Sequence, residues 1–243
     1  NSGSSLPFNS IVAAELSKTH TINPFVNQGA IATTSLLYNN NIDKFRKKIL
    51  SNLDLYAGRT LTFNNAVYKS EMKTNNTNMA LAYLLKSYGR LYGNVEDSVK
   101  VYTQQCSVNV HAKDLATMAC VFAKGGIHPK THKRIVSKET SQYIIRSMRG
   151  EGLYDYSETW ETDVGCVAAK SGVGGGIIIV LKGIGGIGIV SPPLDKFGNS
   201  VKGIESGKLL SNGIQNILNK REKFCTQTRK KKSLKSKSSS RKA

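Results

Sequence analysis

Apolar side chains in the first 150 positions follow a helical pattern. They recur at intervals of three and four residues, which places them on one face of an α-helix. Capping residues precede several of these stretches and glycines follow them, as at the ends of helices. The pattern predicts irregular structure up to residue 23, and then helices over residues 23–40, 42–53, 70–89, 95–105, 113–123 and 137–150.

The pattern changes beyond Gly150. Short apolar runs separated by glycine-rich turns replace the helical spacing, which is typical of β-strands. Two of these runs are joined into a hairpin by Lys182-Gly183. We predict strands over residues 166–169, 176–181 and 184–190, and a closing helix over residues 203–218. Many helices followed by a late hairpin indicate an α+β fold rather than alternating βαβ units.

The positive charge is concentrated at one end of the chain. The 243 residues carry a formal net charge of +19 and are 39% hydrophobic, which is enough to build a core. Residues 219–243 hold eleven Lys or Arg against one Glu, so +10 of the +19 lies there. We therefore predict a folded domain over residues 1–218 and a basic, disordered tail over residues 219–243. Such a tail is most often a solvated extension, although it also suits nucleic acid or an anionic membrane.

The cysteines and histidines show no metal-binding spacing. His128 and His132 lie four residues apart, but Pro129 between them disfavours a helical metal site. We interpret them as loop histidines and expect no metal. Three of the four cysteines have apolar surroundings, so we expect buried free thiols, which favour a reducing compartment. No apolar run reaches the length of a membrane span.

The glycine-rich segment around residues 170–176 is a candidate for chemistry. It lacks the G-x-x-x-x-G-K-[ST] pattern of a phosphate loop and precedes a strand rather than a helix. Lys170-Ser171-Gly172 instead matches the Lys-[Ser/Thr]-Gly of serine acyltransferases of the penicillin-binding type. There, a backbone N–H of an edge strand faces a developing oxyanion. The alternative is a strand whose glycines allow close packing on a helix.

Such acyl transfer requires a Ser-x-x-Lys spacing, which puts a lysine base beside a nucleophilic serine. The spacing occurs at Ser70–Lys73 and again at Ser239–Lys242, within the predicted tail. Ser70 is equally well explained as a helix N-cap followed by the first-turn Glu71. Spacing alone leaves both interpretations of Ser70 open.

Eight segments in a fixed order are more specific than either motif. They are Ser2-Gly3 with Pro7-Phe8-Asn9-Ser10, Asn23–Ile31, Ser70-Glu71 with Asn78-Met79-Ala80, Tyr102 with Gln105-Cys106-Ser107, Asp114-Leu115-Ala116, Gly152-Leu153-Tyr154-Asp155, Lys170–Gly176, and Ser191–Asp195 with Gly198–Val201. In this order they resemble the serine-dependent glutaminase family. The resemblance implies a β-lactamase/penicillin-binding-like α+β fold, with helices packed on an antiparallel sheet.

The resemblance also implies a site for free L-glutamine, with no cofactor. A carboxylate suits the α-ammonium group of this substrate, while amide and phenol groups suit its α-carboxylate. Tyr154 is implied to be catalytic and to move protons, and the Val173 backbone N–H to complete the oxyanion hole. The residues implied to bind substrate are Asn27, Glu71, Asn78, Tyr102, Tyr154 and Val173.

In the family, the Ser-x-x-Lys nucleophile precedes the element that Ser2-Gly3 resembles. We therefore expect the nucleophile, its lysine and the first strands of the sheet to be absent from these residues, and this chain alone to be inactive. Family membership further implies an intracellular, most simply cytoplasmic, homo-oligomer, either a dimer or a tetramer. The segment Cys166–Lys170 is one residue longer than the family pattern, a departure that affects Val173 most directly.

Two other classes of function are compatible with parts of the sequence. A penicillin-binding or β-lactamase-like acyl enzyme would keep the fold, but Glu71, Asn78 and Tyr102 disfavour it. A non-enzymatic protein whose basic tail binds nucleic acid or anionic membrane is the second alternative.

Overall fold

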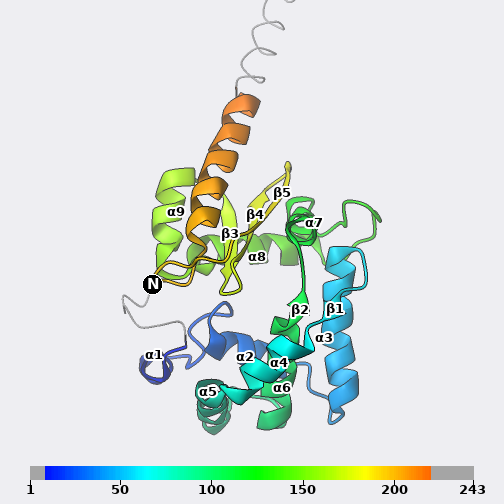
Figure 1. Ribbon diagram of the computed structural model, residues 1–243, viewed down its shortest axis with the longest axis vertical. Helices are drawn as coiled ribbons and strands as arrows, with labels where there is room; N and C mark the ends of the chain where they lie inside the picture. Colours follow the sequence, from blue (N-terminus) through cyan, green and yellow to red (C-terminus); the bar gives the residue numbers. More distant parts are fainter. Residues whose placement is uncertain (1–8, 220–243) are drawn as a thin grey trace, which may run out of the picture.

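The molecule consists of a part built around a small sheet and a part built of helices alone (Figure 1). The structure is a computed structural model that describes residues 9–219. The sheet is antiparallel and consists of β3 (Ala168–Gly172), β4 (Gly176–Leu181) and β5 (Gly185–Val190), in that spatial order. Below it in Figure 1 lie α1 (Ile11–Leu16), α2 (Asn27–Ser35), α4 (Asn65–Lys73), α5 (Asn76–Ser87) and α6 (Val95–Cys106). The predicted α+β class, with helices packed on an antiparallel sheet, is confirmed.

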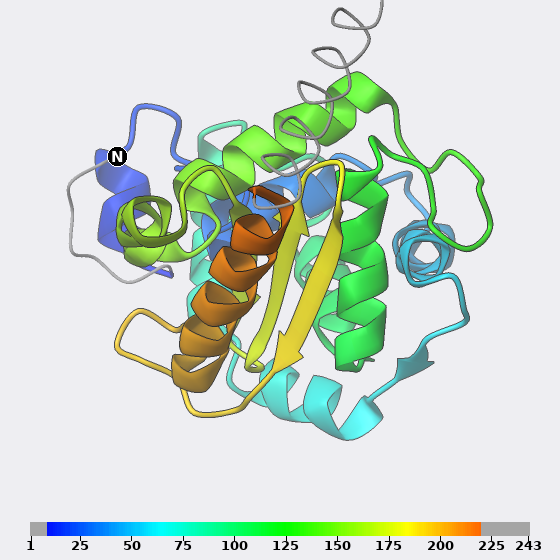
Figure 2. The ribbon, with the colours of Figure 1, turned by 90° about the horizontal axis from the view of Figure 1, so that it is seen from above.

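Helices cover both faces of the sheet, as the view from above shows (Figure 2). One face is covered by α7 (Ala112–Ala123) and α8 (Lys138–Glu151). The other is covered by α9 (Ser157–Val164) and by the helix over residues 201–219, which is orange in Figure 2. The sheet is thus the middle layer of three, which is how a two-sided apolar sheet is buried.

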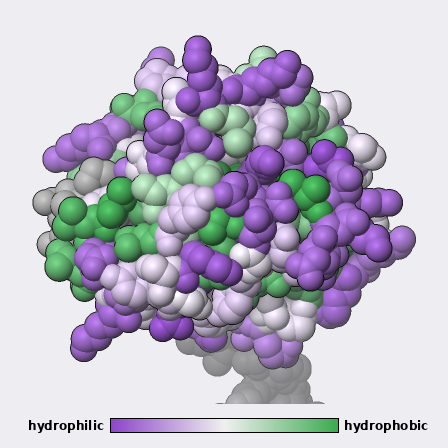
Figure 3. Space-filling model, turned by 90° about the horizontal axis from the view of Figure 1, so that it is seen from below, coloured by the Kyte–Doolittle hydropathy of each residue, from purple (hydrophilic) through white to green (hydrophobic). Residues whose placement is uncertain are grey.

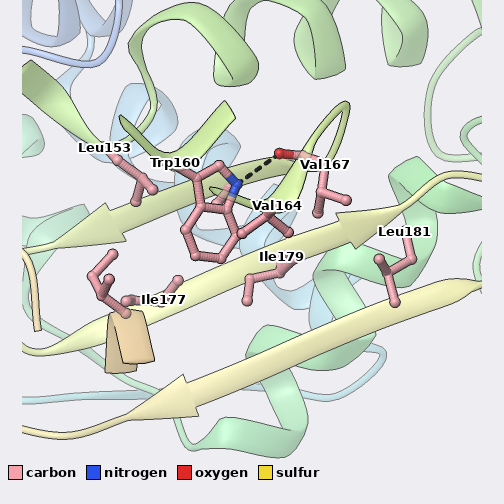
Figure 4. Close-up of a cluster of buried hydrophobic side chains, with 9 residues drawn as sticks. Leu153, Trp160, Val164, Val167, Ile177, Ile179 and Leu181 are labelled. Carbon is pink, nitrogen blue, oxygen red and sulfur yellow. Dashed lines mark hydrogen bonds between the residues drawn. The ribbon is translucent and has the colours of Figure 1, made fainter. Parts of the chain in front are cut away.

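Strand β4 supplies apolar side chains to both layers. Its alternate residues Ile177, Ile179 and Leu181 pack around Trp160, as Figure 4 shows. The intervening Ile178 and Val180 pack on the α7 and α8 side instead. This alternation follows from the two-residue period of a strand. The indole Nε1 of Trp160 donates to the Val167 carbonyl at 2.8 Å, so the one polar atom of the ring is satisfied in the core.

Strand β5 approaches α7 backbone to backbone. A Cβ atom at Gly186 would lie 2.5 Å from the Ala116 carbonyl oxygen, and one at Gly188 would lie 2.1 Å from that of Ala112. Both distances are shorter than the van der Waals contact of a Cβ atom. The neighbouring atoms belong to the backbone and cannot move aside, so a side chain cannot be accommodated at either position. The alternation of glycine and isoleucine in β5 therefore places glycine against the helix. These two glycines lie outside residues 170–176, to which the packing alternative refers; within that segment, a Cβ at Gly172 or Gly174 would meet no atom within 4 Å.

An ion pair between a partly exposed arginine and a buried aspartate links the segment after α3 (Ile42–Ala57) to the first turn of α7. The Arg59 guanidinium donates to both carboxylate oxygens of Asp114, at 2.8 and 2.6 Å. The Asp114 side chain is 4% exposed, and it also accepts from the His111 backbone N–H at 3.0 Å as part of a capping box. The Arg59 hydrogen bonds are the main reason why the pKa of the Asp114 carboxyl is lowered.

Several predicted boundaries are confirmed. Strand β4 has the predicted bounds, α3 begins at the predicted residue, and α6 and α7 agree to within one residue at each end. Ser137 caps α8 as predicted, because its hydroxyl accepts from the Thr140 backbone N–H at 3.0 Å. The closing helix is also present, over residues 201–219. Apart from Asn219, the predicted tail lies outside the described residues.

Three helix predictions are wrong. The segment predicted to be irregular contains α1, which Ser10 caps. Asn23 does not begin a helix: its side chain accepts from the Phe25 backbone N–H at 2.9 Å and closes a turn, so that α2 begins at Asn27. Ser70 is not an N-cap either, because Asn64 caps α4 and a break separates α4 from α5.

The sequence pattern also missed short elements. These are the two-residue strands β1 (Thr62–Phe63) and β2 (Val108–Asn109), the 3₁₀ turn η1 (Tyr154–Tyr156) and α9. Two residues are too few to show a period, and η1 and α9 follow α8 with only a short gap.

The prediction of buried thiols is wrong. Cys106 and Cys166 are exposed and Cys120 is partly exposed, although all three are free as expected. Cys225 lies outside the described residues.

Apolar side chains gather on one part of the lower surface. Figure 3 shows this face from below, with green side chains at its left, over α1. Exposed apolar residues there include Ile11, Val12 and Leu16, of which Leu16 is 76% exposed. Within residues 9–219, no helix has the length and apolarity needed to cross a membrane.

Candidate active site

Three of the predicted site residues form one hydrogen-bonded cluster. Asn27 is the first residue of α2, Asn78 lies in the first turn of α5, and Tyr102 lies on α6. The Asn27 side-chain amide donates to Asn78 Oδ1 at 2.8 Å, and the Tyr102 hydroxyl donates to Asn27 Oδ1 at 3.3 Å. Since the three helices pack on one another, residues that are 75 positions apart converge on one point.

Glu71 and Cys106 lie within electrostatic range of this cluster. Tyr102 and Cys106 are one helical turn apart on α6 and are hydrogen-bonded to each other. Burial, and after it the charges of Cys106, Tyr154 and Glu71, raises the pKa of Tyr102 far above its ordinary value. Burial also raises the pKa of Cys106 to about 11, with a further contribution from Glu71. Cys106 is nevertheless solvent-exposed, so solvent reaches the thiol although protein surrounds it on most sides.

Tyr154 has a strained backbone at the entrance to η1. Its φ angle is +55°, in the left-handed region that a non-glycine residue rarely adopts. Ser157 holds the turn, because its hydroxyl accepts from the Leu153 N–H at 3.0 Å and donates to the Tyr154 carbonyl at 2.9 Å. Such outliers persist only where the surroundings determine the conformation, and they are enriched at functional sites.

Ser171 and Asn199 support the Tyr154 turn from the sheet. The Ser171 hydroxyl donates to Asn199 Oδ1 at 2.5 Å, and Asn199 Nδ2 donates to the Leu153 carbonyl at 3.1 Å. The Ser171 N–H donates to the Gly152 carbonyl at 3.1 Å. Burial raises the pKa of the Tyr154 phenol, and a side-chain hydrogen bond with Ser171 opposes that shift. The middle residue of the Lys-Ser-Gly segment therefore touches the predicted catalytic tyrosine.

Lys170 brings a cation to the same place. Its Nζ lies 4.7 Å from the centroid of the Tyr154 ring and 5.9 Å from that of Phe25, and it donates to the Ser171 carbonyl. Burial lowers the pKa of Lys170 to about 8, while the charge of Cys106 acts in the opposite direction. Neither Lys170 nor Cys106 was among the predicted site residues, although both lie within motifs that carry the family resemblance.

Val173 is placed in a turn rather than in a strand. It follows β3 in the turn that leads to β4, which the Gly175 N–H closes by donating to the Gly172 carbonyl at 2.9 Å. The Val173 side chain is 54% exposed. Its backbone N–H has no hydrogen-bond acceptor among residues 9–219.

Ser70 does not have the surroundings of a nucleophile. Both Ser70 and Lys73 are exposed in the last turn of α4, and no hydrogen bond joins their side chains. The Ser70 carbonyl accepts from the Thr74 hydroxyl at 3.3 Å, an ordinary contact at a helix end. Ser239–Lys242 lies outside the described residues.

The histidines are not grouped with other metal ligands. No set of three or more His, Cys, Asp or Glu side chains within residues 9–219 could hold a metal ion. His128 is fully buried in the loop after α7, where its Nδ1 accepts from the Lys130 and Thr131 backbone N–H groups. Burial lowers its pKa. His128 is therefore a loop histidine as predicted, with a role in holding the loop together.

An open pocket lies beside this site and not in it. It has a volume of about 380 Å³ and contains none of the six predicted residues. Its wall includes Asn23, whose side-chain amide donates to Glu151 Oε2 at 3.0 Å, three residues before Tyr154.

The fold and the site together define a class. Helices on an antiparallel sheet, with Lys-Ser-Gly in a strand beside a strained tyrosine, have the β-lactamase-like architecture of serine acyl enzymes. The glutaminase family model matches residues 1–217, and the chain belongs to the glutaminase family.

Relatives of known sequence and structure agree. The chain is 48% identical to a glutaminase of Colwellia psychrerythraea over 198 residues, or 81% of this chain and 63% of that one. It is 44% identical to glutaminase 1 of Escherichia coli, over 82% of this chain and 64% of that one. A solved Bacillus glutaminase superimposes with a TM-score of 0.80 at 32% identity, over 88% of this chain and 72% of that one. The chain thus spans less than two thirds of the length of these two curated relatives.

Proposed function

We propose that the complete protein is a glutaminase that hydrolyses free L-glutamine to L-glutamate and ammonia through a serine acyl-enzyme. The observation that carries this proposal is the Asn27–Asn78–Tyr102 cluster with Glu71 beside it. An amino acid presents an ammonium and a carboxylate on one carbon, and this cluster presents a carboxylate beside amide and phenol groups. In a β-lactam whose amine is acylated, that nitrogen is an uncharged amide and cannot pair with Glu71. The penicillin-binding alternative therefore explains the cluster less well.

The reaction would take place at the side-chain amide of the bound glutamine. A serine oxygen attacks the amide carbon, the C–N bond breaks, and ammonia leaves after taking up a proton. Water then cleaves the glutamyl ester and releases glutamate. Tyr154 would move the protons, and the Val173 backbone N–H would stabilise the oxyanion, since it has no acceptor among the described residues.

The nucleophile is not assigned to Ser70. Ser70 is exposed and is not paired with Lys73, whereas acyl transfer needs serine and base in contact. We therefore propose that the nucleophile and its lysine lie in polypeptide outside the 243 residues, and that these residues alone are inactive. Turnover by the printed chain that is lost in Ser70→Ala would contradict this assignment.

Replacing Glu71 by Gln in the full-length protein tests the proposed function. We expect the KM for glutamine to rise about ten- to a hundred-fold, because a charge-assisted hydrogen bond is lost. Glu158→Gln, at an acidic residue on α9, is the matched control and should leave KM unchanged. Ammonia release measured against glutamine concentration gives both values. Equal KM for Glu71→Gln and wild type would remove the main support for the glutamine site.

We also propose that the complete protein is a homo-oligomer and that a second copy covers the apolar surface of α1. Ile11, Val12 and Leu16 support this proposal, because exposed apolar groups of this kind mark interaction sites. In the Leu16→Glu variant, light scattering should show a smaller mass than in wild type. An unchanged mass would place the interface elsewhere.

A further inference from the structure

We propose that Lys170 is a positioning residue that holds the Tyr154 ring in place through its ammonium charge. This inference rests on the proposed function, because it assigns a task in that reaction to a residue that does not touch the substrate. The geometry that points to it is the ammonium, which lies 4.7 Å from the Tyr154 ring centroid and faces the Phe25 ring on another side at 5.9 Å. A cation over an aromatic face is attracted by the electron density of the ring.

The ammonium itself is fixed from two directions. It donates to the carbonyl of Ser171, in the strand that carries Lys170. The Phe25 ring on its other side is set by Asn23, whose Oδ1 accepts from the Phe25 N–H at 2.9 Å. Asn23 is anchored in turn to Glu151 at the end of α8. The ammonium is thus held independently of Tyr154, and it lies against both the Phe25 and the Tyr154 ring.

Tyr154 needs support of this kind. Its backbone is held by Leu153, Ser157 and Asn199, but these contacts determine the φ angle of +55° rather than the direction of the ring. The ring is contacted by the ammonium on its face, and the phenol is contacted by Ser171. Lys170 and Ser171 are adjacent in β3, so one strand controls both the face and the tip of the side chain.

The charge on this ammonium responds to pH in the range where such enzymes work. The titratable groups that face Lys170 are Cys106 of α6 and Tyr154 of η1, and Glu71 of α4 faces Cys106 in turn. Burial lowers the pKa of Lys170 to about 8. As the pH rises through that value the proton is lost, and the ring loses its cation.

Lys170→Met and Lys170→Arg in the full-length protein test this role through ammonia release at different pH values. In wild type, kcat should fall with an apparent pKa near 8. Lys170→Met should lower kcat at neutral pH about ten-fold, leave KM within two-fold, and remove the fall near pH 8. Lys170→Arg, which stays charged, should recover most of kcat at neutral pH and keep it at pH 9. The control, Lys182→Met in the exposed β4–β5 turn, should match wild type.

Two kinetic results would overturn the proposal. One is a Lys170→Met variant with an unchanged kcat. The other is a Lys170→Arg variant that keeps the wild-type fall near pH 8. Thermal melting monitored by circular dichroism identifies a variant that has merely failed to fold, and the Arg variant then carries the test alone.

A second measurement does not require catalytic turnover and uses the 243-residue chain. In protein labelled with ¹³C-tyrosine, the ring signal of Tyr154, assigned through Tyr154→Phe, should shift with a midpoint near pH 8. The same signal should stay flat across that range in Lys170→Met. A flat wild-type signal would overturn the proposal, even if the complete protein hydrolyses glutamine. If the signal shifts but the complete protein does not hydrolyse glutamine, the proposed function is overturned and the Lys170–Tyr154 coupling stands.

Discussion

Tyr154→Phe should lower kcat of the full-length protein about 10²- to 10⁴-fold with little change in the KM for glutamine, which is the usual effect of losing a proton-transfer group. The hydroxyl group is the only part of the side chain that this change removes, so the ring can still pack against Lys170. Tyr154 is suited to this role by its place: Ser171 bonds to the phenol, and Cys106 and Tyr102 lie within electrostatic range. Initial rates of ammonia release over a range of glutamine concentrations provide both constants.

Tyr143→Phe is a suitable control for Tyr154→Phe. Tyr143 is a tyrosine on α8 that is 64% exposed, so its hydroxyl has no part in the site. Its variant should retain wild-type kcat. If Tyr154→Phe raised KM and left kcat unchanged, Tyr154 would be a substrate-binding residue and the proton transfer would need another group.

Arg59→Met should reduce the free energy of unfolding by clearly more than the loss of an exposed ion pair does, because it leaves the Asp114 carboxylate without its main partner. The Asp114 side chain is only 4% exposed, so solvent cannot replace the two hydrogen bonds from the guanidinium. Urea denaturation of the printed chain at pH 7 measures this difference directly. The matched control is Arg46→Met, which breaks the exposed Arg46–Asp43 pair on α3 and should cost about 0.5 kcal/mol or less.

The same variant should differ less from wild type in acid. The pKa of Asp114 is lower in the folded chain than the unfolded value of about 3.9, mainly through Arg59. Its contribution to stability is therefore complete above pH 4 and is lost as the pH falls through the folded-state pKa. A destabilisation by Arg59→Met that stayed constant from pH 7 to pH 2 would show that the lost packing of the arginine stem matters more than its charge.

Much of the fold could be predicted because its signals are local. The period of the apolar residues in β4 and the capping serine of α8 lie within single segments, and both predictions are confirmed. Predictions were wrong where a polar side chain had two local uses. Asn23 can cap a helix or close a turn, and in the structure it closes a turn. This turn packs against Gly29, where a Cβ atom would lie 1.9 Å from the Asn23 carbonyl oxygen. Periodicity carries no information on such a contact.

Only a part of the candidate site could be predicted, because some of its properties depend on contacts between distant segments. Resemblance to a family named Asn27, Asn78 and Tyr102, and the structure brings these three side chains together. It did not name Lys170, since the amine is buried among Phe25, Tyr154 and Cys106, which belong to different segments, and it is this burial that lowers its pKa. Burial of a charge is a property of the assembled molecule and cannot be read from neighbours in the sequence.

The sheet has one side that can still accept a partner. The outer edge of β3 is engaged at Ser171, whose N–H donates to the Gly152 carbonyl, whereas β5 pairs with β4 and with no other strand among residues 9–219. Any strand that joins must therefore add next to β5. It would lie about 4.8 Å further out and extend the apolar layer that Ile187 and Ile189 begin. The sheet can thus be extended at its β5 edge, and its width depends on whether a further strand pairs there.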